Sequence, residues 1–194
     1  MMNLQLTQIY LKPGNIYISE TPVLISTLLG SCVAVTMFSP RLKASAICHG
    51  LLPTCKGKKP CVYEEFCNEG IRYVDCSISR MLAWFMQHGV ARGEIDVKIF
   101  GGSDMFSGGE NISSMTVGQQ NIVMAFQVIE EEKLRINVFD VGGSKGRKIL
   151  FISHTGVVLL KRLRKSETEI QKVNPAQYVK YMSSHQESID DETS

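Results

Sequence analysis

The chain has 194 residues, of which 44% are hydrophobic and 21% are charged. These proportions are ordinary for a globular protein and exclude a wholly disordered chain, a collagen-like chain and a coiled coil. The 21 basic and 19 acidic residues leave a formal net charge of +2, which argues against a nucleic-acid-binding protein, because such proteins carry a marked basic face. The length predicts one compact domain with extra segments, large enough to fold without disulfides or a metal.

The chain shows no segment that we expect to enter a membrane. Its N-terminus lacks the basic and then apolar stretch of a secretory signal. Residues 21–40 are uncharged over the length of a membrane span, but they contain two prolines and several hydroxyl side chains. We therefore predict two buried strands joined by a tight turn, no membrane insertion and a cytoplasmic location.

The first half of the chain predicts strands within residues 16–38 and at 44–52, which are rich in β-branched and apolar residues. Their continuous apolar character is typical of strands buried on both faces. The polar residues 54–70 then predict a surface loop. An amphipathic helix follows and is expected to stop at Gly89. Its apolar face consists of Val74, Ile78, Met81, Leu82 and Phe85.

The second half predicts a strand at residues 95–100, a helix at 119–132, a half-exposed strand at 134–141 and a hairpin of residues 149–153 and 157–163. Because strands outnumber helices and occur in adjacent runs, the pattern favours an α+β fold over a doubly wound sheet. The apolar face of the second helix is expected to consist of Ile122, Val123, Phe126 and Ile129.

The main domain is expected to span residues 1–165. Residues 166–194 are polar and are predicted to form an extension that ends in a disordered acidic tail.

The chain contains six cysteines, and no two of them have the C-x-x-C spacing of a zinc site or a redox motif. We therefore predict no metal site, and we expect most of these cysteines to be reduced and structural. The six are Cys32, Cys48, Cys55, Cys61, Cys67 and Cys76.

Cys32 has a different setting from the others, because it follows a Gly-Ser turn directly after an apolar strand. Such a turn presents a thiol beside free backbone N–H groups, which are the components of an oxyanion hole. A cysteine nucleophile also needs a nearby imidazole that lowers the pKa of the thiol. The chain offers four candidates, namely His49, His88, His154 and His185.

His49 is the strongest of these candidates, because it lies in an apolar strand and a buried histidine needs a hydrogen-bond partner. Ser26 and Thr27 supply hydroxyl groups on the strand before Cys32. Two interpretations remain open from spacing alone. One is a Cys-His-hydroxyl triad built from two neighbouring strands, and the other is a small buried cysteine beside a hydrogen-bonded core histidine.

Several motifs in this order resemble the CheD family, the chemoreceptor glutamine deamidases of bacterial and archaeal chemotaxis. Residues 29–35 read L-G-S-C-V-A-V, and residues 49–53 read H-G-L-L-P. Residues 98–106 read K-I-F-G-G-S-D-M-F, residues 111–121 begin with Asn-Ile and end in Asn, and residues 140–147 read D-V-G-G-S-K-G-R. The motifs together cover about residues 15 to 163.

The resemblance implies a catalytic triad of cysteine, histidine and threonine. The cysteine falls on Cys32, the histidine on His49 and the threonine position on Ser26, where serine keeps the hydroxyl. Because side chains alternate along a strand, Thr27 is expected to face away, and it is the less favoured substitute. Backbone N–H groups near Ser31 and Cys32 are expected to hold the oxyanion, with no metal or organic cofactor.

The resemblance also implies a layered α+β fold with a β-sandwich, similar to that of cysteine-dependent deamidating toxins. The expected reaction is hydrolysis of glutamine side chains on the cytoplasmic helices of chemoreceptors to glutamate, through a thioester. The implied partners are chemoreceptor cytoplasmic domains and a CheC-type phosphatase. The alternatives are a mainly non-catalytic receptor adaptor or regulator of that phosphatase, and, less favoured, a transglutaminase-like transfer to an amine.

Overall fold

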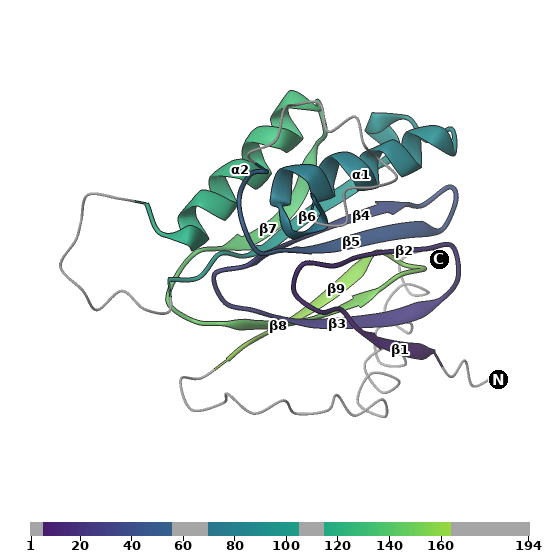
Figure 1. Cartoon of the computed structure of the whole chain (residues 1–194). Coiled ribbons are helices and arrows are strands. Elements are labelled where there is room, and N and C mark those ends of the chain that lie inside the picture. The colour runs from purple at the N-terminus through teal and green to yellow at the C-terminus, as the bar shows by residue number, and fades with distance from the viewer. Residues whose placement is uncertain (1–5, 56–69, 105–114, 164–194) are drawn as a thin grey trace, which may run out of the picture. The chain divides into compact units, whose positions relative to one another are not determined.

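The computed structural model describes residues 6–55, 70–104 and 115–163 and confirms a mixed α+β fold. Two helices cover one face of a five-stranded sheet, and a four-stranded sheet lies against the other face (Figure 1). Part of the predicted loop at residues 54–70 and the whole predicted extension at residues 166–194 lie outside the described residues. The similarity to deamidating toxins stays a prediction.

The four-stranded sheet has the order β1-β3-β8-β9. Its strands are β1 (Thr7–Tyr10), β3 (Val23–Leu29), β8 (Arg147–Ile152) and β9 (Val157–Arg162). Strands β8 and β9 form the predicted antiparallel hairpin. Strand β1 was not predicted, because it is short and largely exposed and carries no apolar alternation; it is held by parallel pairing with β3.

The five-stranded sheet has the order β2-β5-β4-β6-β7. Every residue of β4 and β5 is buried, as predicted, because helices cover one face of these strands and the other sheet covers the opposite face. The strands of this sheet are β2 (Ile16–Ser19), β4 (Val33–Ser39), β5 (Ala44–Gly50), β6 (Asp96–Gly101) and β7 (Ile136–Val141).

The uncharged segment at residues 21–40 forms β3 and β4, as expected, but these two strands do not pair with each other. Strand β3 pairs with β1 and β8, whereas β4 pairs with β5 and β6. The segment therefore links the two sheets. Within the described residues, no helix has the length and apolar character needed to cross a membrane.

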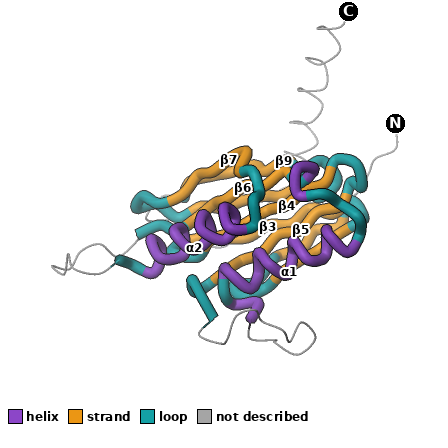
Figure 2. The backbone as a smooth tube through the Cα atoms, turned by 90° about the horizontal axis from the view of Figure 1, so that it is seen from above, coloured by secondary structure: helices purple, strands orange, loops and turns teal. Residues whose placement is uncertain are grey.

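The two α-helices, α1 (Val74–Gln87) and α2 (Val117–Glu131), lie side by side across the five-stranded sheet (Figure 2). Two short 3-10 helices, η1 (Gly70–Arg72) and η2 (Arg92–Glu94), flank α1. The predicted apolar face of α1 is confirmed, since all five of its residues are buried. Gly89 follows the helix with the positive φ of +70° that ends many helices.

The buried face of α2 differs from the prediction. Ile129 is buried as expected, but Val123 is 50% exposed, and the polar Asn121 is fully buried beside Ala125. The apolar pattern misplaced this face because a buried amide carries no hydrophobic signal. The reason for burying Asn121 lies in its hydrogen bonds, described below.

Candidate active site

The chain crosses from one sheet to the other through Gly30, Ser31 and Cys32, which we call the nucleophile turn after the predicted role of Cys32. Strand β3 ends at Leu29 and β4 begins at Val33, so these three residues form the whole connection. Ser31 is exposed, and Cys32 is partly buried against the apolar core between the sheets. The thiol therefore lies at one end of the sandwich, beside solvent.

Backbone contacts from the loop after β6 fix the nucleophile turn. The N–H of Gly102 donates to the carbonyl of Cys32 at 2.8 Å, and the N–H of Ser103 donates to the carbonyl of Gly30 at 2.8 Å. Gly101 has a φ of +109°, and a Cβ atom there would lie 2.2 Å from the Cys32 carbonyl oxygen. Only glycine fits this close approach.

Strand pairing brings Cys32 and His49 to the same face of the five-stranded sheet. His49 on β5 lies opposite Ala34 on β4. Because side chains alternate, Cys32, two residues before Ala34, points to the same side and is the diagonal neighbour of His49. That side faces the core between the two sheets. The predicted pairing of this cysteine with this histidine is therefore consistent with the strand register.

The hydroxyl beside His49 belongs to Thr27, which lies in the opposite sheet. Thr27 Oγ1 is 2.6 Å from His49 Nδ1, and it donates to the carbonyl oxygen of Leu11 at 2.8 Å. The expectation that Ser26 faces the histidine is wrong. Ser26 Oγ contacts the carbonyl oxygen of Ile9 at 3.5 Å, on the other face of β3.

The alternation along β3 explains this correction. Val23, Ile25 and Leu29 are buried in the core between the sheets, so Thr27 shares their face. Ser26 and Thr27 do face opposite sides of β3, as expected, but Thr27 and not Ser26 faces the histidine. The hydroxyl, the imidazole and the thiol therefore come from both sheets rather than from two neighbouring strands.

The hydrogen bonds of Thr27 determine which His49 nitrogen carries the proton. A hydroxyl has one hydrogen, and Thr27 donates it to Leu11. Donation by His49 Nδ1 is then the arrangement that satisfies its contact with Thr27 Oγ1, and it leaves Nε2 of the neutral ring with a free lone pair. Nε2 is buried and has no hydrogen-bond partner among the described residues. It is therefore available to accept a proton.

Burial keeps both the imidazole and the thiol neutral. It lowers the pKa of His49 to about 4, although a hydrogen bond to the Leu11 backbone acts in the opposite direction. Burial also raises the pKa of the Cys32 thiol, and the thiol's contact with its own backbone N–H partly opposes this. At rest, the thiol and the imidazole are thus both neutral, rather than a thiolate and an imidazolium.

The other described histidines are far from this arrangement. His88 follows α1 and stacks on Trp84, and His154 lies in the β8–β9 turn, whose backbone meets Val23 at the opposite end of β3 from the nucleophile turn. His185 lies outside the described residues. In the described ranges, no cluster of three or more His, Cys, Asp or Glu side chains is arranged to hold a metal ion.

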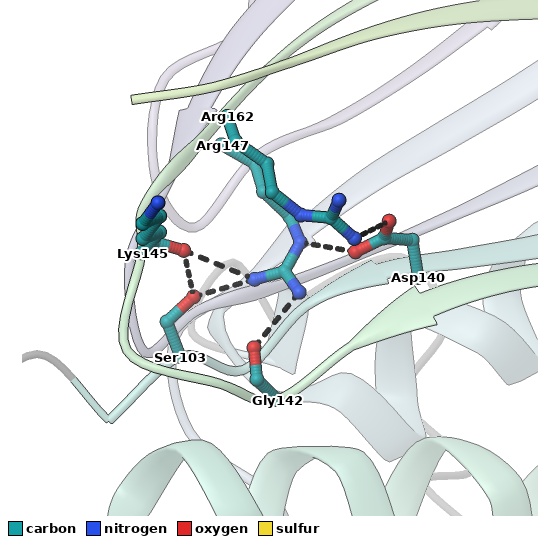
Figure 3. A network of polar contacts seen from close by, with 6 residues as sticks. All are labelled: Ser103, Asp140, Gly142, Lys145, Arg147 and Arg162. Carbon is teal, nitrogen blue, oxygen red and sulfur yellow. Dashed lines mark hydrogen bonds and ion pairs between the residues drawn. The ribbon is translucent and has the colours of Figure 1, made fainter. Parts of the chain in front are cut away.

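A buried arginine stabilises the loops behind the nucleophile turn (Figure 3). Arg147 is 3% exposed. It donates to Asp140 at 2.7 Å, to Ser103 Oγ at 2.6 Å and to the carbonyl of Gly142 at 2.8 Å. Because the Ser103 N–H binds Gly30, the guanidinium connects β7 and β8 to the nucleophile turn.

Asn121 on α2 contacts the site from the helical layer. Its Nδ2 donates to the carbonyl oxygens of Ser31 and Leu51, both at 3.0 Å. These carbonyls belong to the nucleophile turn and to the segment just after His49. The motif analysis included Asn121 without a role, and only the fold shows what its amide binds.

Comparison with known proteins shows the family to which the chain belongs. The family model described as "CheD chemotactic sensory transduction" matches residues 59–162, more than half of the chain. A protein of Geobacter sulfurreducens named "Probable chemoreceptor glutamine deamidase CheD 2" is 45% identical over 165 residues, covering 85% of this chain and 96% of that protein. This chain belongs to the CheD family. The resemblance inferred from the motifs is confirmed.

CheD relatives in two further organisms are less similar to this chain. Proteins named "Probable chemoreceptor glutamine deamidase CheD" are 37% identical in Maridesulfovibrio salexigens and 32% identical in Methanococcus maripaludis. The matches cover 81% and 78% of this chain and 93% and 92% of those proteins. These names agree with the expected protein-glutamine glutaminase of chemotaxis.

Proposed function

We propose that this CheD protein hydrolyses the carboxamide of specific glutamines on the cytoplasmic helices of chemoreceptors, giving glutamate and ammonia. The names of its relatives support the substrate class. The observation that supports the chemistry is the contact of Thr27 with His49 Nδ1, which leaves Nε2 as a buried base on the face shared with Cys32.

Acylation would begin with transfer of the Cys32 thiol proton to His49 Nε2 as the sulfur attacks the amide carbon. The tetrahedral oxyanion would be held by backbone N–H groups of the nucleophile turn. Among the described residues, no backbone carbonyl outside regular secondary structure accepts from the N–H of Ser31 or Cys32. His49 then gives its proton to the nitrogen, the C–N bond breaks, and ammonia leaves a thioester on Cys32.

Deacylation would use the same base. His49 Nε2 takes a proton from water as its oxygen attacks the thioester carbon, and the proton passes to the leaving sulfur. The products are glutamate on the receptor and the original thiol. The reaction adds one negative charge to a receptor helix at each modified position. Thr27 would keep Nε2 aligned for both steps by accepting the Nδ1 proton in a hydrogen bond.

Two alternatives predict different products. A receptor adaptor or regulator of a CheC-type phosphatase would bind its partner without changing it. A transglutaminase-like enzyme would pass the acyl group from Cys32 to an amine in place of water. The buried His49, whose Nδ1 is held by Thr27 while Nε2 has no partner among the described residues, favours catalysis over a purely adaptor role. A buried imidazole without a task would be better replaced by an apolar side chain.

The test is to incubate a chemoreceptor cytoplasmic fragment with the wild-type protein and with Cys32→Ala, and to follow the glutamines by peptide mass spectrometry and the ammonia released. We expect conversion of glutamine to glutamate by the wild type alone, with one ammonia for each glutamate. Binding without conversion by the wild type would favour the adaptor, and a lysine or polyamine adduct would favour amine transfer. Full activity of a folded Cys32→Ala protein would contradict the proposed nucleophile.

A further inference from the structure

We propose that Asn121 is a positioning residue, which holds the Ser31–Cys32 peptide so that the Cys32 N–H faces the oxyanion of the reaction. This inference rests on the proposed deamidase function. It concerns a residue in the helical layer, outside the Cys-His-hydroxyl set. Its support is the pair of hydrogen bonds that Asn121 makes to the backbone of the site.

Both bonds of Asn121 are made by the same amide nitrogen. Nδ2 carries two hydrogens, and the carbonyls of Ser31 and Leu51 lie 3.0 Å from it. One carbonyl precedes the nucleophile and the other lies two residues after the base His49. The amide therefore links the two segments that carry the reacting groups, as no apolar side chain at this position could.

The bond to Ser31 has a second consequence, because the Ser31 carbonyl and the Cys32 N–H belong to one planar peptide unit. In a trans peptide these two groups point in opposite directions. When Asn121 binds the carbonyl, the Cys32 N–H is directed away from α2. The Cys32 backbone N–H also acts to lower the pKa of the Cys32 thiol. We infer that it faces the sulfur and the oxyanion that would form there.

Helix α2 is placed firmly enough to serve this purpose. Its first turn is capped by Thr116, whose hydroxyl accepts from the N–H of Gln119. Gly118 packs so closely on the loop after β6 that a Cβ atom there would lie 2.8 Å from the Gly102 carbonyl oxygen. Asn121 follows one turn later and is fully buried. The position of Asn121 is thus set by the backbone contacts of α2 and by burial of the side chain.

The Asn121 side chain also carries a cost that argues against a purely structural role. Its Oδ1 is buried and has no hydrogen-bond partner among the described residues. An unsatisfied buried acceptor destabilises the folded state. The presence of an amide here is explained if its two Nδ2 hydrogens are needed to hold the carbonyls of Ser31 and Leu51 in place.

The test measures the thiol without using the receptor. Iodoacetamide modification of Cys32 is followed against pH in the wild type, Asn121→Leu and Val128→Ala, by mass spectrometry of the tryptic peptide ending at Arg41, in which Cys32 is the only cysteine. Asn121→Leu keeps a similar volume and removes both donors. Val128→Ala is the matched control, because it removes buried volume from the same helix without touching the nucleophile turn.

We expect Asn121→Leu to shift the midpoint of the pH profile upward, so that modification near neutral pH slows at least about fivefold, because the N–H that stabilises the thiolate is no longer held in place. Val128→Ala should keep the wild-type midpoint. On a receptor fragment, the same Leu variant should lose kcat with KM unchanged. A wild-type midpoint in folded Asn121→Leu would overturn the proposal.

If Asn121→Leu does not fold, Asn121→Ser takes its place. We expect its pH midpoint to shift upward as well, and a wild-type midpoint in the folded Ser variant would overturn the proposal. Because the modification assay needs no substrate, this test gives its answer even if deamidation of receptors is not observed. Failure of the proposed function and failure of the positioning role are therefore separate results.

Discussion

The hydroxyl oxygen of Thr27 and the Nδ1 atom of His49 lie 2.6 Å apart, although the two residues belong to different sheets. Thr27 lies on β3, inside the four-stranded sheet, and His49 lies on β5, inside the five-stranded sheet. The contact therefore depends on the packing of the whole sandwich. The orientation of the His49 ring is thus tied to the packing of both sheets.

Thr27→Ala should slow deamidation at least about tenfold, because His49 loses the oxygen that fixes its tautomer and ring orientation. Ser26→Ala should keep nearly the wild-type rate, since its hydroxyl contacts only the Ile9 carbonyl on the opposite face. The measurement is the initial rate of glutamate formation, with both variants checked for thermal stability. The reverse order of the two effects would return the orienting role to Ser26.

The burial of His49 predicts a pH-dependent stability. An unfolded histidine takes up a proton near its ordinary pKa of 6.5, whereas the folded one does so only at about 4. Between these values the unfolded state binds more protons, so the free energy of unfolding falls as the pH falls. From about pH 7.5 to about pH 4.5 this one residue should remove about 2.5 kcal/mol.

His49→Asn removes that titration. Denaturant unfolding at both pH values should show a smaller loss for the variant than for the wild type, with all other groups common to both proteins. An equal loss in the two proteins would mean that His49 titrates alike in the folded and unfolded states.

Arg147 and Arg162 provide a matched pair, because both bind Asp140, at 2.7 and 2.5 Å (Figure 3). The Arg162 side chain is 58% exposed, and Arg162→Met should cost less than about 1 kcal/mol of unfolding free energy. Arg147→Met should cost about 2–4 kcal/mol, because the buried Ser103 hydroxyl and the Gly142 carbonyl lose their charged donor. Equal losses would show that the buried network does not stabilise these loops.

Substitutions at two glycines test how closely the backbone at Gly101 approaches the nucleophile turn. Gly143 and Gly101 both have positive φ, but a Cβ at Gly143 meets no atom within 4 Å, whereas one at Gly101 would overlap the Cys32 carbonyl. Gly143→Ala should cost about 1 kcal/mol through backbone strain alone. Gly101→Ala should cost at least about 2 kcal/mol more and should lower the reactivity of Cys32. Calorimetry and thiol modification measure the two effects, and similar values for both variants would contradict this account of the turn.

Much of the fold follows from local patterns. The apolar face of α1, the fully buried strands β4 and β5 and the β8–β9 hairpin are all visible in the sequence, because hydrophobic periodicity and turn residues determine them directly. Strand β1 has no such signal. It forms because β3 offers an edge for pairing, which is a tertiary effect.

The candidate site was predicted less completely, for reasons that concern particular residues. The choice between Ser26 and Thr27 depends on the phase of β3, and leucines stand at both phases of that strand, so alternation alone does not fix its inner face. The side of α2 that carries Asn121 was missed because its burial comes from hydrogen bonds to Ser31 and Leu51. Such contacts connect segments far apart in the chain, and no local pattern encodes them.

The central claim is that the Cys32 thiol is the nucleophile of a glutamine deamidase. Its most direct test treats the wild-type protein with limiting iodoacetamide, then measures in the same samples the fraction of Cys32 modified and the remaining rate of glutamate formation on a receptor fragment. The account predicts that activity falls in proportion to modification of Cys32 and reaches zero when modification is complete. Full activity in protein whose Cys32 is completely modified would contradict it.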